Sequence, residues 1–180
     1  ARDRKESGAA VEGVVGTLMT NFGLELALKT LGVEFVRAKV GDRYVMEQLD
    51  QRGWLIGGES SGHLVCLDCT STGDGTVSAL QVLAALSRRD QSLADAVADV
   101  ALLPQTMINV RGSSRDGFMD KAEVKAAMAD VEGKLGGNGR ILLRPSGTEP
   151  LVRVMIEGKD ADQVASLCRE LADVVEKAIA

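Results

Sequence analysis

The chain has 180 residues, enough to bury a core without a disulfide or metal staple. With 45% hydrophobic and 26% charged residues, its composition is that of a globular protein rather than a disordered chain or a coiled coil. A formal net charge of −5 gives no basic stripe for nucleic acid or an anionic membrane.

No segment approaches the roughly 18 to 20 apolar residues that a membrane span requires, and the first residues do not resemble a signal peptide. Three cysteines, an odd number, favour a reducing compartment. We therefore expect a cytoplasmic protein. Because the first residue is Ala rather than Met, we also expect the chain to be part of a longer one.

Strands alternate with helices over the first hundred residues, a pattern typical of α/β proteins. Apolar runs predict strands, and apolar residues at helical spacing predict the helices between them. Asp42 is expected to be an N-cap, and glycines at 32 and 53 are expected to end the helices before them. The expected strands are 11–19, 34–38, 54–58 and 64–68, and the expected helices are 24–31, 42–52, 79–86 and 92–100.

A junction is expected at Pro104, which cannot continue a helix. We place the domains at 1–103 and 104–180. The first is predicted to be a three-layer-like α/β domain with a mixed sheet, and the second a smaller α+β domain with helices on one face of an antiparallel sheet. The elements expected in the second domain are strands 105–111, 140–143 and 151–156 and helices 120–135 and 161–178.

The first loop whose residues suggest a chemical role, residues 57–63, reads Gly-Gly-Glu-Ser-Ser-Gly-His between two expected strands. A carboxylate and two hydroxyls among glycines offer acceptors and donors to a polyhydroxylated ligand such as a sugar. The alternative is a tight hairpin whose glycines adopt positive φ and whose Glu59 is only solvated. His63, the only histidine, could be a general acid or base or a hydrogen-bonded structural residue.

The second loop, residues 144–150, reads Arg-Pro-Ser-Gly-Thr-Glu-Pro, and Arg153 follows on the next expected strand. Backbone N–H groups around a glycine form a concave anion site, and a guanidinium binds two oxygens at once. The loop therefore favours phosphate over a turn that an arginine merely caps. It lacks the GxxxxGK[ST] spacing of a P-loop.

Other polar clusters are explained without a ligand. Cys66 and Cys69 have CxxC spacing but no second Cys or His pair for zinc, so we expect ordinary thiols. The residues Asp42-Arg43 and Thr72-Gly73-Asp74-Gly75 stand at expected helix starts, where capping accounts for them.

Together, the segments 58–63 and 144–150 resemble the sugar-binding and phosphate-binding loops of the α-D-phosphohexomutase superfamily. Segments 15–21, 38–45 and 72–75 resemble the subfamily that acts on glucosamine phosphates, in the same order along the chain. The resemblance covers nearly the whole chain and corresponds to the third and fourth of the superfamily's four domains. It implies a sugar-binding first domain and a phosphate-binding second domain.

The resemblance also implies roles for individual residues. Ring hydroxyls would be bound by Glu59 and Ser61, with His63 assisting or orienting Glu59, and Asp42 and Arg43 would line the cleft. The non-reacting phosphate would be held by Arg144, Ser146, Gly147, Thr148 and Arg153. Both loops are expected to face one ligand.

The implied activity is the interconversion of glucosamine 6-phosphate and glucosamine 1-phosphate through a phosphoserine enzyme and a bisphosphate intermediate. The chain has no Thr-Ala-Ser-His-Asn-Pro-like segment for the nucleophile and no Asp-Gly-Asp-x-Asp-Arg-like loop for Mg²⁺. We therefore expect this part to be inactive alone, with Mg²⁺ and the nucleophile supplied by preceding domains of the same polypeptide. The alternatives are a mutase for mannose or glucose phosphates, or a non-catalytic module that binds sugar phosphates.

Overall fold

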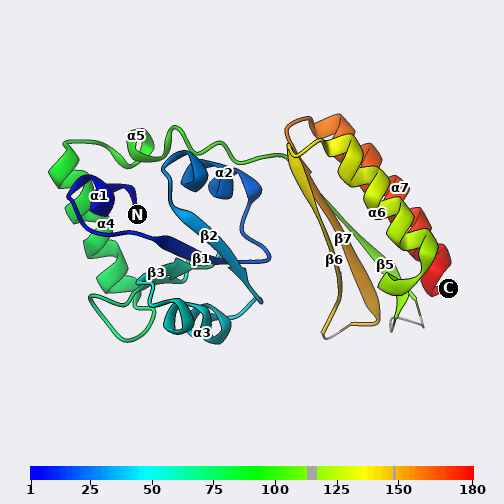
Figure 1. Ribbon diagram of the computed structural model, residues 1–180, viewed down its shortest axis with the longest axis horizontal. Coiled ribbons are helices and arrows are strands. Elements are labelled where there is room, and N and C mark those ends of the chain that lie inside the picture. Colours follow the sequence, from blue (N-terminus) through cyan, green and yellow to red (C-terminus); the bar gives the residue numbers. More distant parts are fainter. Residues whose placement is uncertain (113–116, 148) are drawn as a thin grey trace. The chain divides into compact units, whose positions relative to one another are not determined.

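A computed structural model of the chain describes residues 1–112, 117–147 and 149–180 (Figure 1). These residues form two compact units, Ala1–Leu102 and Leu103–Ala180, which we call the N-terminal unit and the C-terminal unit. Among the helices in these ranges, none combines the length and the apolar character that a membrane crossing requires.

The N-terminal unit is built on a mixed four-stranded sheet with the strand order β2-β1-β3-β4. Strand β1 (Gly13–Thr17) pairs in parallel with β2 (Glu34–Ala38) and β3 (Ile56–Gly58), and β4 (Leu64–Cys66) is antiparallel to β3. The helices are α1 (Arg2–Glu6), α2 (Phe22–Thr30), α3 (Asp42–Arg52), α4 (Gly75–Arg89) and α5 (Leu93–Val97). The predicted mixed sheet is confirmed.

The core of this unit lies between the sheet and α3. Val45 and Leu49, one helical turn apart on α3, are fully buried in one cluster with Val15 of β1 and Val65 of β4. Because α3 follows β2 directly, its packing fixes the loop between them at the end of the sheet.

The C-terminal unit has an antiparallel sheet with the strand order β5-β7-β6. Figure 1 shows its two long helices on the same side of this sheet. Alternation along the strands places Ile108, Val154 and Leu143 against these helices, and their neighbours in sequence point to the other face. The elements are β5 (Gln105–Arg111), η1 (Phe118–Asp120), α6 (Ala122–Leu135), β6 (Gly139–Pro145), β7 (Leu151–Gly158) and α7 (Ala161–Ile179).

The structure corrects several expected boundaries. Gly41, not Asp42, is the N-cap of α3, because the Asp42 side chain is directed to a histidine far along the chain. The expected helix 92–100 is reduced to α5, which a capping box at Ser92 starts. The expected strand 11–19 is only β1, since the turn closed by Thr20 donating its backbone N–H to Thr17 ends it. The expected helix 120–135 begins at Ala122, after the short helix η1.

Candidate functional site

The loops singled out in the N-terminal unit meet at one edge of its sheet. The three parallel strands end at the same edge, where α/β proteins bind ligands. The loop after β1 is tied to β2 by the backbone N–H of Leu18, which donates to the carbonyl of Ala38 at 2.9 Å. Arg37 of β2 adds a hydrogen bond of 2.6 Å from its Nη1 to the carbonyl of Thr20. The sequence motifs are thus brought together by backbone contacts.

The segment 57–63 forms the hairpin between β3 and β4. The backbone N–H of Glu59 donates to the carbonyl of His63 at 2.8 Å, and that of Gly62 donates to the carbonyl of Glu59 at 3.0 Å. Gly62 has a φ of +95°, which glycine adopts readily in such a three-residue loop. The hairpin alternative considered from the sequence is therefore present in the fold, and it leaves Ser60 and Ser61 exposed at the tip.

Glu59 is held rather than free in solvent. Its Oε1 accepts a hydrogen bond of 2.8 Å from the backbone N–H of Gly41, in the loop between β2 and α3. A hydrogen bond to a charged acceptor is stronger than one between neutral groups. This contact fixes the carboxylate at the carboxyl edge of the sheet while one oxygen remains available for a ligand.

His63 and Asp42 form a pair beside Glu59. His63 Nε2 lies 2.7 Å from Asp42 Oδ1, without hydrogen-bond geometry, and both atoms are shielded from solvent although the side chains are 36% and 43% exposed. The backbone of Gly73, before α4, closes over the imidazole: a Cβ added at Gly73 would stand 2.0 Å from Nε2. The structure therefore gives His63 a fixed position. Both a structural histidine and a general acid or base would have such a position.

Gly73→Ala tests this arrangement, because the added methyl group cannot coexist with the present imidazole position. We expect the hairpin to shift and the affinity for glucosamine 6-phosphate, the ligand that the sequence resemblance implies, to fall about tenfold, the scale of losing one hydrogen bond of about 1.4 kcal/mol. Titration calorimetry measures the change. Gly75→Ala is the matched control, since nothing in the described chain lies within 4 Å of its added Cβ. If Gly73→Ala and Gly75→Ala bound the ligand with equal affinity, the interpretation that Gly73 positions His63 for ligand binding would be wrong.

Asp42 and Arg43 differ in their surroundings. Asp42 faces His63, whereas Arg43 is exposed and its guanidinium lies 5.8 Å from the centre of the Tyr44 ring. Lys39 lies 5.6 Å from the same ring. The expected cap at the later cluster is present, since Asp74 accepts a hydrogen bond of 2.8 Å from the backbone N–H of Val77.

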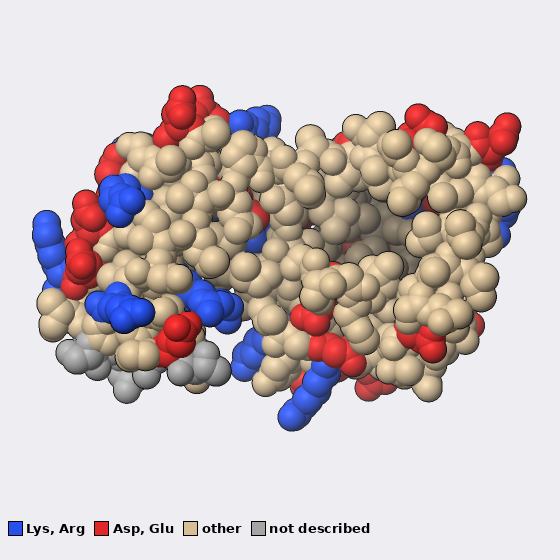
Figure 2. Space-filling view, turned by 180° about the vertical axis from the view of Figure 1, so that it is seen from behind, with Lys and Arg blue, Asp and Glu red and all other residues tan. Residues whose placement is uncertain are grey.

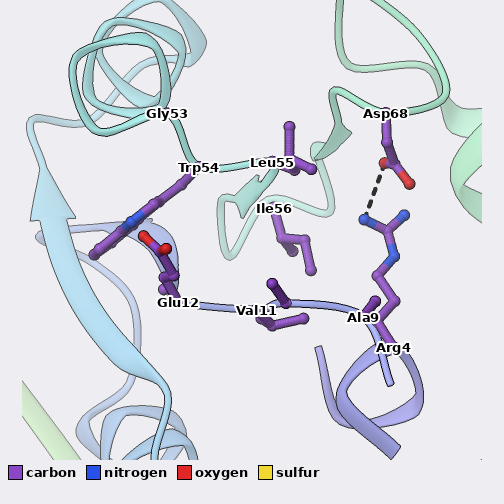
Figure 3. A pocket seen from close by; sticks show the side chains of 11 residues that line it. Arg4, Ala9, Val11, Glu12, Gly53, Trp54, Leu55, Ile56 and Asp68 are labelled. Carbon is purple, nitrogen blue, oxygen red and sulfur yellow. Dashed lines mark ion pairs between the residues drawn. The ribbon is translucent and has the colours of Figure 1, made fainter. Parts of the chain in front are cut away.

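A cavity of about 280 Å³ lies at the opposite edge of the sheet (Figure 3). It is lined by the residues before β1 and by Trp54 and Leu55 before β3, and an ion pair of 2.9 Å between Arg4 and Asp68 lies at one side. Because ligands of α/β sheets bind at the carboxyl ends of the strands, we do not assign this cavity to the sugar.

In the C-terminal unit, the two arginines that were predicted to bind phosphate lie directly opposite one another. Arg144 of β6 pairs in register with Arg153 of β7, and Arg153 pairs in register with Asn109 of β5. All three therefore lie on the sheet face turned away from α6 and α7. Within the described residues, the Nε atoms of both arginines are buried and have no hydrogen-bond partner. Glu149 is 3.9 Å from Arg153 Nη2, a loose ion pair.

The loop between β6 and β7 is closed by Ser146. Its backbone N–H donates to the carbonyl of Leu151 at 2.9 Å, and its buried Oγ accepts from the backbone N–H of Glu149 at 3.3 Å. Gly147 is exposed, and nothing in the described chain lies within 4 Å of the place its Cβ would take. Packing therefore does not require a glycine there. Thr148, also predicted to bind phosphate, lies outside the described residues.

The described residues contain no group of three His, Cys, Asp or Glu side chains that could hold a metal ion. All three cysteines are free thiols, and burial raises the pKa of Cys168 in the core of the C-terminal unit.

Three residues of these sites were missed by the sequence analysis: Gly41, Gly73 and Asn109. The two glycines act through contacts with side chains 18 and 10 positions away, which no local pattern reveals. Asn109 did carry a signal, since it is a polar residue inside the apolar run 106–110.

Both units match domains of one protein family. Residues 1–102 match the alpha/beta/alpha domain III of phosphoglucomutase/phosphomannomutase, and residues 107–174 match the C-terminal domain of the same proteins. The chain therefore belongs to the phosphoglucomutase/phosphomannomutase family, and the resemblance to the phosphohexomutases is confirmed.

The individual relatives with high sequence identity to the chain include phosphoglucosamine mutases. The chain is 82% identical to the phosphoglucosamine mutase of Alcanivorax borkumensis over 99% of its own length and 40% of the relative's. It is 59% identical to that of an Azoarcus strain, over 94% of the chain and 38% of the relative. The chain thus spans about two fifths of the curated relatives that it matches.

Solved structures show the same fold. The Aspergillus fumigatus N-acetylphosphoglucosamine mutase in complex with GlcNAc-6P and magnesium matches with a TM-score of 0.79 at 20% identity, over 99% of this chain and 42% of that one. A Burkholderia thailandensis phosphoglucomutase/phosphomannomutase family protein matches with a TM-score of 0.71 at 18% identity, over 98% and 40%.

Proposed function

We propose that this chain is the substrate-binding C-terminal part of a phosphoglucosamine mutase, which interconverts glucosamine 6-phosphate and glucosamine 1-phosphate. The 82% identity to the Alcanivorax borkumensis enzyme supports the amino sugar over mannose or glucose. The fungal structure with GlcNAc-6P and magnesium supports a phosphorylated hexosamine as the ligand of this fold.

The observation that carries the proposal is the pair of arginines across β6 and β7. Like charges directly opposite one another on neighbouring strands destabilise a sheet, so their placement costs free energy unless an anion lies between them. A phosphate oxygen pair matches the planar fork of a guanidinium. We infer that Arg144 and Arg153, with Asn109 and the backbone around Gly147, bind the phosphate that is not reacting.

The sugar ring is assigned to the hairpin of the N-terminal unit. Glu59 is oriented by Gly41 and flanked by the pair of His63 and Asp42, and the exposed Ser61 hydroxyl stands at the hairpin tip. These groups combine a charged acceptor with a neutral hydroxyl, which suits the hydroxyls and the amino group of glucosamine.

The reaction explains why both sites are needed. A mutase that works through a phosphoserine and a bisphosphate must hold the sugar in two opposite orientations, with either phosphate at the reacting position. A site of backbone N–H groups and guanidinium groups recognises any phosphate and so serves both orientations. Phosphoryl transfer depends mainly on positioning and charge stabilisation, and this part of the protein would supply the positioning.

The test compares this chain with the longer protein made by joining it at Ala1 to the preceding residues of the Alcanivorax borkumensis relative. We expect the chain alone to bind glucosamine 6-phosphate in a calorimetric titration but to form no 1-phosphate by ³¹P nuclear magnetic resonance. The joined protein is expected to turn over when Mg²⁺ is present. Sustained turnover by the chain alone, or no binding by it, would overturn the proposal.

A further inference from the structure

The turn that follows β4 brings two cysteines close together. Strand β4 ends at Cys66, and the backbone N–H groups of Cys69 and Thr70 both donate to the carbonyl of Cys66, at 2.9 and 3.1 Å. A turn closed by a hydrogen bond between positions i and i+3 keeps their Cα atoms within about 7 Å, and a disulfide bridges about 4.4 to 6.8 Å. In an extended strand, the same spacing separates the Cα atoms by about 10 Å. The turn, which ends the expected strand 64–68 early, therefore makes a bond between the two sulfurs feasible.

The three thiols of the chain differ in their access to solvent. Cys69 is exposed and Cys66 is partly buried, whereas Cys168 is fully buried in the core of the C-terminal unit. An oxidant from solvent therefore reaches Cys69 first. Cys66 needs no access of its own, because it lies in the same turn, and Cys168 serves as an internal control.

The surroundings of the pair make it slow to react. Desolvation, with a smaller contribution from the Asp68 carboxylate, raises the pKa of Cys69, and the thiolate is the reactive form. Residues 1–102 carry 14 Asp and Glu against 10 Lys and Arg, and Figure 2 shows acidic side chains spread over the visible face of this unit. This negative field slows the approach of an anionic oxidant. The pair is thus suited to sustained oxidising conditions rather than to a brief burst.

The turn is also joined to the hairpin that carries His63. Asp68, between the two cysteines, forms an ion pair of 2.9 Å with Arg4, which holds one side of the turn (Figure 3). Four residues after Cys69, the backbone of Gly73 packs over the His63 imidazole. A disulfide fixes its two sulfurs about 2.05 Å apart, so closing it restricts the turn and the segment that leads to Gly73.

We propose that Cys66 and Cys69 are a reversible modification site that glutathione disulfide oxidises to an intramolecular disulfide, and that His63 senses the redox state of this site. The Cys69 thiolate attacks one sulfur of glutathione disulfide, forms a mixed disulfide and releases one glutathione thiolate. The Cys66 thiolate then attacks the Cys69 sulfur, forms the protein disulfide and displaces the second glutathione. The two cysteines lose two protons and two electrons, and one glutathione disulfide becomes two glutathione thiols. This site does not depend on the function proposed above.

Peptide mass spectrometry tests the disulfide directly. Trypsin cleaves after Lys and Arg, and none lies between Arg52 and Arg88, so both cysteines fall in the peptide 53–88. The chain is incubated with glutathione disulfide and then labelled with N-ethylmaleimide in urea. We expect this peptide to lose two hydrogen atoms and to carry no label, and dithiothreitol to restore both labels. Cys168 is expected to be oxidised at least tenfold more slowly, because it reacts only when the core opens.

Three outcomes of this experiment would overturn the proposal. The first is full labelling of both cysteines after the incubation. The second is a mixed disulfide with glutathione that persists at Cys69 without passing to Cys66. The third is a disulfide that links two chains, because the turn would then not hold the two sulfurs of one chain together.

Asp68→Asn tests the order of the two steps. Removing the carboxylate lowers the pKa of Cys69 toward its ordinary value, so more thiolate is present, and we expect oxidation to proceed about threefold faster. Asp50→Asn, at an exposed position of α3, is the matched control and is expected to leave the rate unchanged. A slower reaction of Asp68→Asn than of the parent chain would contradict Cys69 as the attacking thiol.

His63, the only histidine of the chain, reports the link to the hairpin. Its imidazole gives a single Cε1–H proton resonance in a nuclear magnetic resonance spectrum. We expect this resonance to shift when the parent chain is oxidised and to stay in place when Cys69→Ser, which cannot form the bridge, is treated in the same way. An unchanged resonance in the oxidised parent chain would overturn the coupling between the turn and His63.

Discussion

Arg144→Ala is expected to weaken the binding of inorganic phosphate by about 1.5 to 3 kcal/mol, roughly a tenfold to hundredfold rise in Kd. The reason is that the phosphate oxygens would lose the charge-assisted hydrogen bonds that Arg144 donates, while Arg153 on the neighbouring strand remains. Isothermal titration with phosphate measures the loss. Arg169→Ala, on an exposed position of α7, is the matched control and is expected to leave Kd unchanged.

The same substitution is expected to act in the opposite direction on stability. Removing one of two facing guanidinium groups relieves a repulsion, so the free energy of unfolding without phosphate should rise by a few tenths of a kcal/mol, up to about 1 kcal/mol. Urea denaturation of the two arginine variants and the parent chain measures it. A variant that binds phosphate normally, or that is destabilised without phosphate, would show that Arg144 is a packing residue.

The fold could be predicted well from local signals. Strands β2 and β5 begin and end where expected, because β-branched and apolar runs are bounded by glycine or proline on at least one side. Helix α7 starts where Asp160 caps it, accepting from the backbone N–H of Gln163 at 2.9 Å. The prediction that Asp42 is the N-cap of α3 was wrong, because the Asp42 side chain faces His63, a partner that the sequence does not reveal.

The site could be predicted as two sets of residues but not as two arrangements. The loop sequences named Arg144, Arg153 and Glu59, yet the register that places the arginines face to face depends on how the strands pair. The hydrogen bond from the backbone N–H of Gly41 to Glu59 depends on the packing of α3 against β1 and β4. Both are tertiary results, because a shift of strand pairing by one residue would turn every side chain to the other face.

Glu59→Ala is expected to weaken the binding of the sugar phosphate without weakening the binding of inorganic phosphate. The Kd for glucosamine 6-phosphate should rise by roughly tenfold to a hundredfold, the scale of losing hydrogen bonds to a charged acceptor, and the Kd for inorganic phosphate should stay within a factor of about two. Glu59 belongs to the N-terminal unit, whereas the phosphate residues belong to the C-terminal unit. Titration of each variant with both ligands measures the division.

Glu59→Gln separates the charge from the position. The Gln amide oxygen can still accept from the backbone N–H of Gly41, so the hairpin should keep its geometry while the ligand loses only a charged acceptor. We therefore expect an affinity between that of the parent and that of Glu59→Ala. Glu47→Ala, at an exposed position of α3, is the control for removing a carboxylate from the same unit. If Glu59→Ala weakened both ligands equally, the carboxylate would be acting on the fold rather than on the sugar, because a ring contact has no counterpart in free phosphate.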